Sequence, residues 1–447
     1  MKKLSVLLVL ALLLTMVATV SADTPAPGGP FNTAFRVQNL GNDDAHCTFA
    51  FYDKDGNTKY QSGALAAIAP GDSLYVYVPS DTTVVAGMYS GVVSCDQEVA
   101  AVANFGDADS GASYSGVSGS ELATTLYAPG IYDNYFNFYS NVVVQNASSS
   151  ANDITLAIYE PGKTTPVYQN TKSGVAANAF VTWDQEGLTE LVDNQFYSAK
   201  ITGTGNVAAI VNIYGRGGSE NTLFSYNAQA SGSSTVYAPV IMNAYFGYNT
   251  ALVVQNMGSV AADVTITYSD AGTGSDWTGT IGPGAAQSFY TPASGVPAGE
   301  LLGAKIVSTN NQELAVIVNE QTGFNRAGTY NGFAAGSQSV SVPVVMNGYF
   351  KWNSSVTCQN VGSGNANMKI AYSGVSGEFS PAEGTSISSG KVGLFYQPAH
   401  LSTLDWIGSA TISSNEDIVC VTNQDQNMPP QSTQKMDQLY VYNGIAK

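Results

Sequence analysis

Four cysteines carry the clearest chemistry in this sequence. Cys47 and Cys95 lie toward one end of the chain, and Cys358 and Cys420 lie toward the other. An even number of cysteines behind an export signal, which is described below, favours disulfides. We expect each pair to cross the core of its own repeat and to contribute roughly 4 kcal/mol in the chain-entropy model. Two pairs of free thiols are the alternative, and no CxxC or Cys/His spacing typical of zinc sites occurs.

Candidate catalytic groups are few. The two histidines, His46 and His400, stand at unrelated positions of the repeats. The chain has no G-x-S-x-G elbow, phosphate-binding loop or H-E-x-x-H motif. A hydrolase with paired carboxylates stays open at this point, because such pairs are not visible in a sequence. Repetition argues against it, since an active site is normally built once, and we predict no catalytic residue and no cofactor.

One acidic stretch, Asp53 to Asn57, resembles the start of a calcium-binding loop. It lacks the distal bidentate glutamate, and the other repeats do not keep its acidic residues. We interpret it as a surface turn and predict no metal site. Weak calcium binding at Asp53 and Asp55 is the alternative.

Aromatic residues gather in three similar segments, which begin at Tyr127, Tyr237 and Val342. Exposed aromatic rings stack on sugars, so these segments are candidates for glycan binding. Packing between neighbouring domains is the other interpretation, and the repetition at each joint favours it. The candidate ligand or joint aromatics are Tyr135, Phe136, Tyr245, Phe246, Tyr349, Phe350 and Trp352.

A recurring motif sets the frame for all these residues. Val254–Gly258 is followed by the alternating run Val264–Tyr268, and related stretches occur three more times. The marker asparagines are spaced 107, 110 and 104 residues apart: Asn39, Asn146, Asn256 and Asn360. A second set follows each marker after 65, 66, 63 and 63 residues: Asn104, Asn212, Asn319 and Asn423. Such constancy indicates four copies of one unit of about a hundred residues.

The marker asparagines are best interpreted as structural, because asparagine tolerates positive φ and bonds to nearby backbone. Ligand binding is the alternative. Lysine–asparagine cross-links would need a lysine near each asparagine. Lys200 and Lys305 align with each other, but Val92 and Thr411 stand at the matching positions of repeats one and four.

Each repeat shows about seven short strands with period-two alternation and frequent turn signals, which is typical of a two-sheet sandwich. The second half of each repeat predicts a hairpin, as in Met88–Cys95 followed by Val99–Asn104. We therefore predict an all-β chain of four tandem immunoglobulin-like antiparallel β-sandwiches. The alternative is a propeller or solenoid, whose units are shorter. The predicted boundaries are 1–22 for a signal peptide and 23–125, 126–234, 235–339 and 340–447 for the repeats.

The N-terminus has the three parts of an export signal: Lys2 and Lys3, the apolar run Leu4–Ala18, and the small residues of Val20–Ala22. No second apolar stretch is long enough to span a membrane, so we expect none in the mature chain. The formal net charge is −17. Phosphate backbones would be repelled, so nucleic acid is not an expected partner.

The pattern in repeat three resembles a known family. Val254–Gly258, Ala262, Val264–Tyr268 and Ile281–Gly284, before Phe289 and Tyr290, are similar to bacterial CARDB-type and related immunoglobulin-like repeats of exported surface proteins. Repeat two departs from the pattern, with Ser148 in place of the glycine and no Pro-Gly turn. The resemblance implies a stalk or adhesion role at the cell surface and no cofactor.

Together these features predict a secreted, non-enzymatic cell-surface protein that acts as a spacer, adhesin or structural subunit, with its sandwiches in a row. Its partner would be a surface glycan, a protein or a second copy joined head to tail. The alternatives are a carbohydrate-binding array that uses the joint aromatics and a self-assembling sheath or filament.

Overall fold

The computed structural model describes residues 7–9, 27–119, 121–216, 222–269, 275–322, 326–426 and 439–447. Within these ranges the chain is all-β with antiparallel pairing, and its one α-helix is the single turn α1 (Gln397–His400). The predicted all-β class with several antiparallel sheets is therefore confirmed. None of the described helices has the length and apolar character needed to cross a lipid bilayer.

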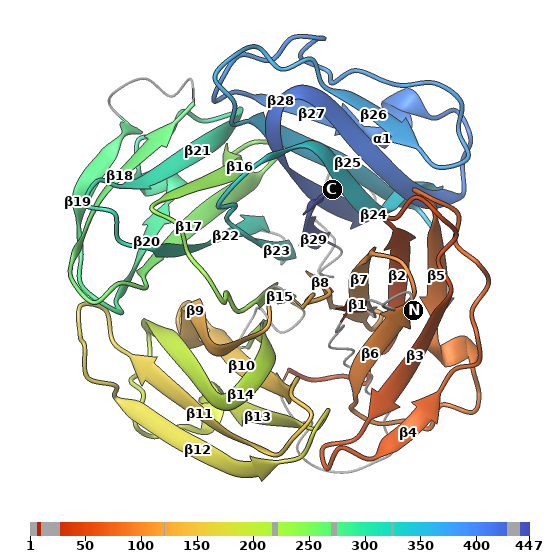
Figure 1. Cartoon of the computed structure of the whole chain (residues 1–447). Coiled ribbons are helices and arrows are strands. Elements are labelled where there is room, and N and C mark those ends of the chain that lie inside the picture. The colour runs from red at the N-terminus through yellow and green to blue at the C-terminus, as the bar shows by residue number, and fades with distance from the viewer. Residues whose placement is uncertain are drawn as a thin grey trace, which may run out of the picture. The chain divides into compact units, whose positions relative to one another are not determined.

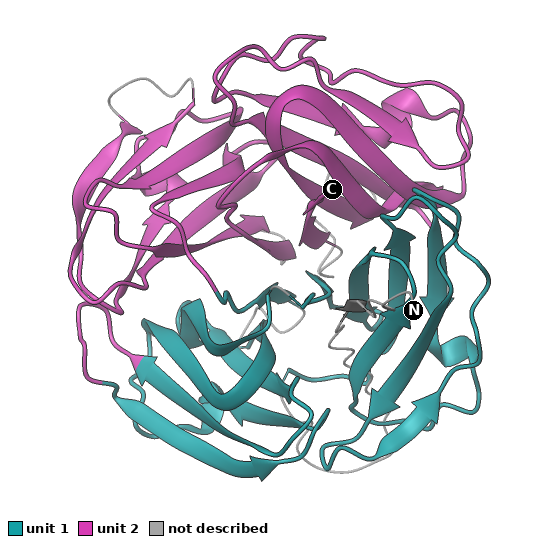
Figure 2. Ribbon diagram, in the orientation of Figure 1, with its two compact units in different colours: residues 1–158, 166–230 teal, residues 159–165, 231–447 magenta. Residues whose placement is uncertain are grey.

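The chain divides into two compact units (Figure 2). Unit one consists of residues 1–158 and 166–230, and unit two of residues 159–165 and 231–447. Repeats one and two therefore lie in unit one, apart from residues 159–165 and 231–234, and repeats three and four lie in unit two.

Repeat one forms two four-stranded sheets, ordered β1-β6-β3-β4 and β5-β2-β7-β8 (Figure 1). Alternate residues of β2 and β3 face a shared core, with Phe35, Val37, Phe49 and Phe51 all at most 5% exposed. The elements are β1 (Leu7–Val9), β2 (Asn32–Asn39), β3 (Cys47–Tyr52), β4 (Thr58–Gln61), β5 (Ser73–Tyr77), the 3-10 turn η1 (Val78–Ser80), β6 (Ser90–Cys95), β7 (Val99–Gly106) and β8 (Gly111–Ser115).

Strand β1 lies inside the predicted signal peptide. It pairs with the edge of β6, with Leu7 opposite Cys95 and Val9 opposite Val93. In the other repeats, this edge is covered by the strand that leads into the repeat. Cleavage after Ala22 would therefore remove an edge strand from the first repeat.

Repeat two contains one seven-stranded hydrogen-bonded sheet, because its strand β14 pairs with strands of both layers. The first strand, β9, begins at Ala123, before the predicted boundary at 126. The elements are β9 (Ala123–Asp133), β10 (Phe138–Asn146), β11 (Asn152–Tyr159), β12 (Tyr168–Val175), β13 (Phe180–Asp184), η2 (Gln185–Gly187), β14 (Gln195–Gly215) and β15 (Leu223–Asn227).

Repeat three has two separate sheets, ordered β16-β21-β18-β19 and β20-β17-β22-β23. Its elements are β16 (Thr235–Asn243), β17 (Tyr248–Asn256), β18 (Ala262–Tyr268), β19 (Trp277–Ile281), β20 (Ala286–Tyr290), η4 (Thr291–Ala293), β21 (Glu300–Ser308), β22 (Leu314–Thr322) and β23 (Arg326–Asn331).

Repeat four resembles repeat two, because the long strand β28 joins its layers. Its elements besides α1 are β24 (Ser337–Tyr349), β25 (Trp352–Asn360), β26 (Lys369–Tyr372), β27 (Val392–Tyr396), β28 (Trp406–Gln426), β29 (Leu439–Asn443) and β30 (Ile445–Ala446).

The hairpin predicted for the second half of each repeat is wrong. In repeat one, β6 pairs with β3 while β7 pairs with β2, so the two segments lie in opposite sheets. In repeats two and four, the same segments are one bent strand of 21 residues, β14 or β28, which Figure 1 shows curving between the layers. The physical reason is that each of the two sheets needs an apolar central strand. The two apolar segments supply one strand to each sheet, and the chain between them crosses from one sheet to the other.

Repeats within a unit pack through equivalent last strands. In unit one, Asn227 of β15 donates a hydrogen bond from Nδ2 to the carbonyl of Ser115 at the end of β8, over 2.7 Å. In unit two, Asn443 of β29 bonds in the same way to Asn331 of β23, over 2.6 Å. Contact between equivalent strands is side-by-side packing, so the end-to-end row expected from the sequence is not the arrangement inside a unit.

Candidate binding site at the aromatic turns

The aromatic segments form three equivalent turns, each between the first strand of a repeat and its marker strand. In repeat two, Tyr135 and Phe138 exchange two backbone hydrogen bonds of 3.0 Å across the turn. Tyr245 and Tyr248 exchange bonds of 3.1 and 2.9 Å in repeat three, and Tyr349 pairs with Trp352 in repeat four. Each turn therefore holds two central residues, the first of which is a phenylalanine.

Both central residues of every turn have positive φ, as in type I′ turns. The phenylalanines have φ values of 53° at Phe136, 48° at Phe246 and 47° at Phe350. Such turns favour Asn-Gly, and a bulky side chain in the left-handed region costs about 1–3 kcal/mol. The same unfavourable residue thus stands at the same place three times.

These phenylalanines are also the exposed part of each aromatic cluster. Phe136 and Phe350 are 73% exposed and Phe246 is 65% exposed. Each ring packs edge-on against the tyrosine before it, with ring centroids 4.7, 4.8 and 4.8 Å apart. We call these rings the tip phenylalanines. The tyrosines brace them and leave most of each phenyl ring open to a partner.

A buried clamp fixes the strand that leads into each turn. The residue after the proline of the first strand bonds to a tyrosine hydroxyl from the last strand of its repeat. Tyr226 donates to the Gly130 carbonyl over 2.8 Å, and Tyr330 donates to the Val240 carbonyl over 2.8 Å. Tyr442 donates to the Val344 carbonyl over 2.5 Å. The turn therefore projects from a rigid base.

In the described part of the chain, the ring contacts of the aromatic segments lie within a repeat. Tyr135 stacks on Tyr132 and contacts Phe196, at centroid distances of 5.5 and 5.7 Å. Trp352 stacks on Tyr440 at 4.7 Å. The segments are thus integral strands and turns of the sandwiches, and the tip phenylalanines are not packed in the joints.

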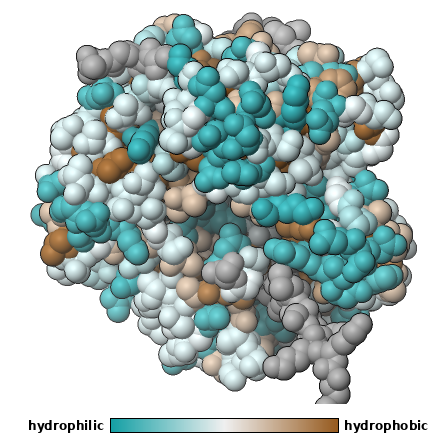
Figure 3. All heavy atoms as spheres, turned by 45° about the horizontal axis from the view of Figure 1, so that its top comes forward, coloured by the Kyte–Doolittle hydropathy of each residue, from teal (hydrophilic) through white to brown (hydrophobic). Residues whose placement is uncertain are grey.

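The charge beside the turns differs from repeat to repeat. Burial raises the pKa of Asp133, at the end of β9, to about 6, and the nearby Asp193 and Glu186 contribute. In repeat four, Lys351 occupies the second central position. On the face shown in Figure 3, hydrophobic residues are scattered among hydrophilic ones. The turns thus present one kind of ring in different electrostatic settings.

All four marker asparagines are fully buried and make the same bonds. Asn256 donates from Nδ2 to the carbonyls of Val260 and Ile281, over 2.7 and 3.0 Å, and its Oδ1 accepts the Gly258 N–H over 2.8 Å. Matching triads are made by Asn39, Asn146 and Asn360. The amide nitrogen and oxygen of each side chain are buried and bonded to backbone, which supports the structural interpretation.

The second set of asparagines lies on the strands that pair with the marker strands. Asn212 and Asn319 accept hydroxyl donors over 2.7 Å from Ser225 and Thr329, respectively. Asn104 is half-buried on β7. Asn423 donates to Glu320 Oε2 over 2.5 Å.

Glu320 belongs to a buried polar cluster between repeats three and four, which sequence reasoning missed. Asp425, two residues after Asn423 on β28, pairs with Arg326 and accepts the Tyr248 hydroxyl over 2.5 Å. Burial raises the pKa of Glu320 to about 8. The sequence did not predict this cluster, because its acidic residues are far apart in the chain and come together only where repeats three and four are in contact. The cluster is sealed from solvent and has the character of a packing device.

Both cysteine pairs form the expected disulfides, Cys47–Cys95 and Cys358–Cys420. The prediction that each disulfide crosses the core between two sheets is wrong. Each joins directly paired residues on neighbouring strands of one sheet, with Cα atoms 4.2 and 4.1 Å apart. The disulfides indicate folding in an oxidising compartment.

The remaining candidates take local roles. His46 contacts Asp96 over 2.9 Å on the surface, whereas His400 bonds to the Tyr372 hydroxyl over 2.7 Å. Asp53 accepts the backbone N–H groups of Asp55 and Asn57, over 3.0 and 2.9 Å, which is turn geometry. In the described ranges, no group of three or more His, Cys, Asp or Glu residues is arranged to hold a metal ion.

Comparisons with known proteins give no family. No family model and no curated protein match the chain. Among solved structures, Thermotoga maritima 1070 is 12% identical with a TM-score of 0.21, covering 24% of this chain and 92% of its own length. The Anabaena sensory rhodopsin transducer is 15% identical with a TM-score of 0.16, covering 19% of this chain and 90% of its own. At these TM-scores neither likeness carries an argument about fold or function.

Proposed function

We propose that this chain is an exported, non-enzymatic adhesin of the cell surface, built of four immunoglobulin-like sandwiches, that grips its partner with the tip phenylalanines. The observation that carries the proposal is the exposed phenylalanine held at positive φ in three matching turns. Strain of this kind persists where the surrounding structure enforces it, and it clusters at functional sites.

The chemistry of the turns supports binding through apolar contact. A phenyl ring offers no hydrogen bond, so its free energy of binding comes from the surface it buries and from its ring face. A single exposed ring contributes a weak contact. Several rings on one chain bind a repetitive partner, such as a cell-surface polymer, more tightly than one ring does. Once the first ring is bound, the others are held at a high effective concentration near the partner.

The test replaces each tip phenylalanine by asparagine in the chain that begins at Asp23. Asparagine is favoured at this position of a type I′ turn, so the triple variant Phe136→Asn, Phe246→Asn, Phe350→Asn keeps the turns and removes the rings. We expect binding to isolated cell-surface material from the producing organism, measured by sedimentation, to fall at least tenfold.

The matched control is Val260→Asn, which removes an apolar side chain that is 54% exposed on another loop. It should leave binding unchanged. A glycan array and a panel of wall proteins then identify the class of partner. Unchanged binding by the triple variant, or no binding by the unmodified chain at millimolar ligand, would refute the proposal.

A further inference from the structure

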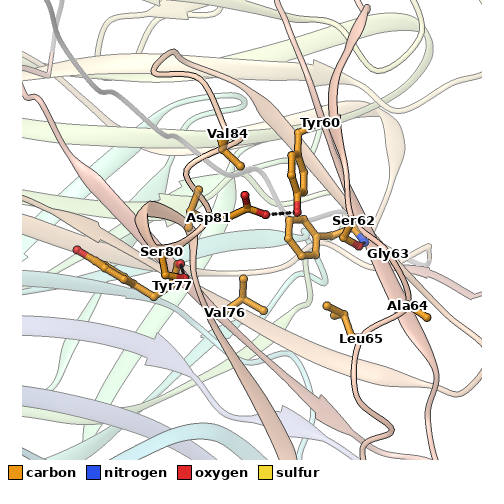
Figure 4. A pocket seen from close by; sticks show the side chains of 12 residues that line it. Tyr60, Ser62, Gly63, Ala64, Leu65, Val76, Tyr77, Ser80, Asp81 and Val84 are labelled. Atoms are coloured by element: carbon orange, nitrogen blue, oxygen red, sulfur yellow. Dashed lines mark hydrogen bonds between the residues drawn. The ribbon is translucent and has the colours of Figure 1, made fainter.

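A cavity of about 250 Å³ opens in repeat one between the end of β4 and strand β5 (Figure 4). Phe49, Leu65, Val76 and Val84 give it an apolar lining, and Ser62 contributes a small polar wall. Figure 4 shows Tyr60 and Asp81 joined at one side of it, with Val76 and Leu65 across from them. The cavity lies within a single repeat and is separate from the aromatic turns.

Repeats three and four differ from repeat one at the position of Ser62. Ser62 bonds through its backbone N–H to Phe49, which stands ten residues after its marker asparagine. At the equivalent site of repeat three, Trp277 pairs with Ile266, and in repeat four Phe379 bonds to Ile370. The first repeat therefore has a serine where two sister repeats have an aromatic ring.

The opposite wall shows the same difference. Val76 of β5 pairs with Phe35, four residues before the marker asparagine. The residues in that register in the other repeats are all aromatic: Trp183, Phe289 and Phe395. In repeat three, the Trp277 and Phe289 rings contact each other at 4.6 Å. Two large-to-small differences thus face each other across the cavity of repeat one.

The rim of the cavity carries a hydrogen-bond acceptor. The Tyr60 hydroxyl donates to Asp81 Oδ2 over 2.5 Å, and Thr83 donates to Oδ1 through its N–H and hydroxyl, over 3.0 and 2.6 Å. A carboxylate has about four acceptor positions, so one more donor can be accommodated. The Tyr60 ring stacks on Phe49 at 5.4 Å and extends the aromatic wall.

We propose that this cavity binds a planar aromatic ring with an N–H or O–H donor, of the indole or phenol type, supplied from outside the repeat. The ring would lie against Ser62 and Val76, the two positions at which repeat three carries an indole and a phenyl ring. Its donor would bond to Asp81. Smaller apolar cavities, of about 150 Å³, are known to bind benzene. The inference is independent of the tip phenylalanines.

The experiment titrates the chain that begins at Asp23 with indole and with phenol, followed by ligand-observed NMR. A ligand of this size is expected to bind saturably with Kd on the order of 0.1–1 mM. Benzene, which lacks the donor, should bind several-fold more weakly. N-acetyltryptophanamide and N-acetyltyrosinamide form a second arm, in which binding shows that the ring can be the side chain of a peptide.

Ser62→Trp restores the ring of the sister repeat and should weaken indole binding more than tenfold while the circular dichroism spectrum is kept. Val76→Phe fills the cavity from the other side and serves if the first variant does not fold. Asp81→Asn should weaken indole and leave benzene unchanged. No saturable binding of indole or phenol up to 10 mM (about a tenfold margin on the expected Kd), or equal binding by the folded filled variants, would overturn the proposal.

Discussion

At the scale of single residues, one buried side chain can organise a loop in every repeat. Asn256 holds its turn by saturating three backbone groups, and the other markers do the same. Glu320 is the opposite case, because Asn423 is its one hydrogen-bond partner in the described part of the chain and its Oε1 has none there. Burial then favours the neutral form of this carboxyl.

The pKa of Glu320 predicts how the stability of unit two depends on pH. The folded pKa is about 8, raised from the ordinary value of 4.5. Between these values the folded state binds the proton and the unfolded state does not, so stability falls as pH rises through this window. Glu320→Gln should remove this loss and be the more stable form at pH 9, by on the order of 2–4 kcal/mol.

Urea unfolding of both proteins at pH 5 and pH 9 measures the difference. Glu313→Gln, at an exposed position, is the control. If Glu320→Gln and the unmodified chain lose the same stability between the two pH values, Glu320 is not protonated in the folded state.

At the scale of elements, the first strand, the turn and the marker strand act together. Tyr226, Tyr330 and Tyr442 clamp the strand, and the turn then holds its phenylalanine at positive φ. Phenylalanine by itself disfavours positive φ, but the surrounding structure imposes positive φ at this one position of each turn. The strain predicts an increase in stability when the residue is changed to one that favours the left-handed region.

Phe246→Asn should raise the thermal midpoint of unit two by about 2–4 °C, which corresponds to about 1 kcal/mol for a unit of this size. Phe246→Ala is the matched control, because it removes the ring without supplying a residue that prefers positive φ. Differential scanning calorimetry distinguishes the two. A midpoint for Phe246→Asn at or below that of Phe246→Ala contradicts a strained turn.

At the scale of the whole molecule, the chain has two units with one disulfide each. The bond in unit one closes a separation of 48 residues, and the bond in unit two closes 62. Because each bond lies inside one unit, each should stabilise only that unit.

Replacing Cys358 and Cys420 by alanine should destabilise unit two by up to about 4 kcal/mol and leave unit one unchanged. Calorimetry should then show one shifted transition and one constant transition. The Cys47→Ala, Cys95→Ala variant should show the reverse. A common shift of both transitions in either variant would mean that the units unfold together.

Export should change the edge of the first repeat. If the signal is cleaved after Ala22, the intact mass of the secreted protein begins at Asp23 and β1 is lost from β6. We expect the amides of β6 to exchange with deuterium faster than those of β21, which keeps its partner β16. Equal protection of both strands in the secreted chain would show that β6 gains another partner.

The sequence by itself determined the features that depend on local chemistry. Alternation predicts strands, and paired cysteines within repeats predict the two disulfides. These signals are readable because period-two burial and asparagine turns are properties of neighbouring residues. The positions of the aromatic segments were visible for the same reason, but not that each segment forms a turn.

Only the tertiary structure decided which strands pair and which rings are exposed. The two segments predicted to form a hairpin pair in different sheets instead, because an alternating pattern does not specify which sheet a strand joins. The sequence did not show which ring of each aromatic segment is exposed. The turn geometry shows that it is the tip phenylalanine and not the tyrosine before it. The sequence did not show that Ser62 and Val76 stand where other repeats have aromatic residues, because the loops before these positions differ in length among repeats. The equivalent positions can be matched only from the pairing of the strands.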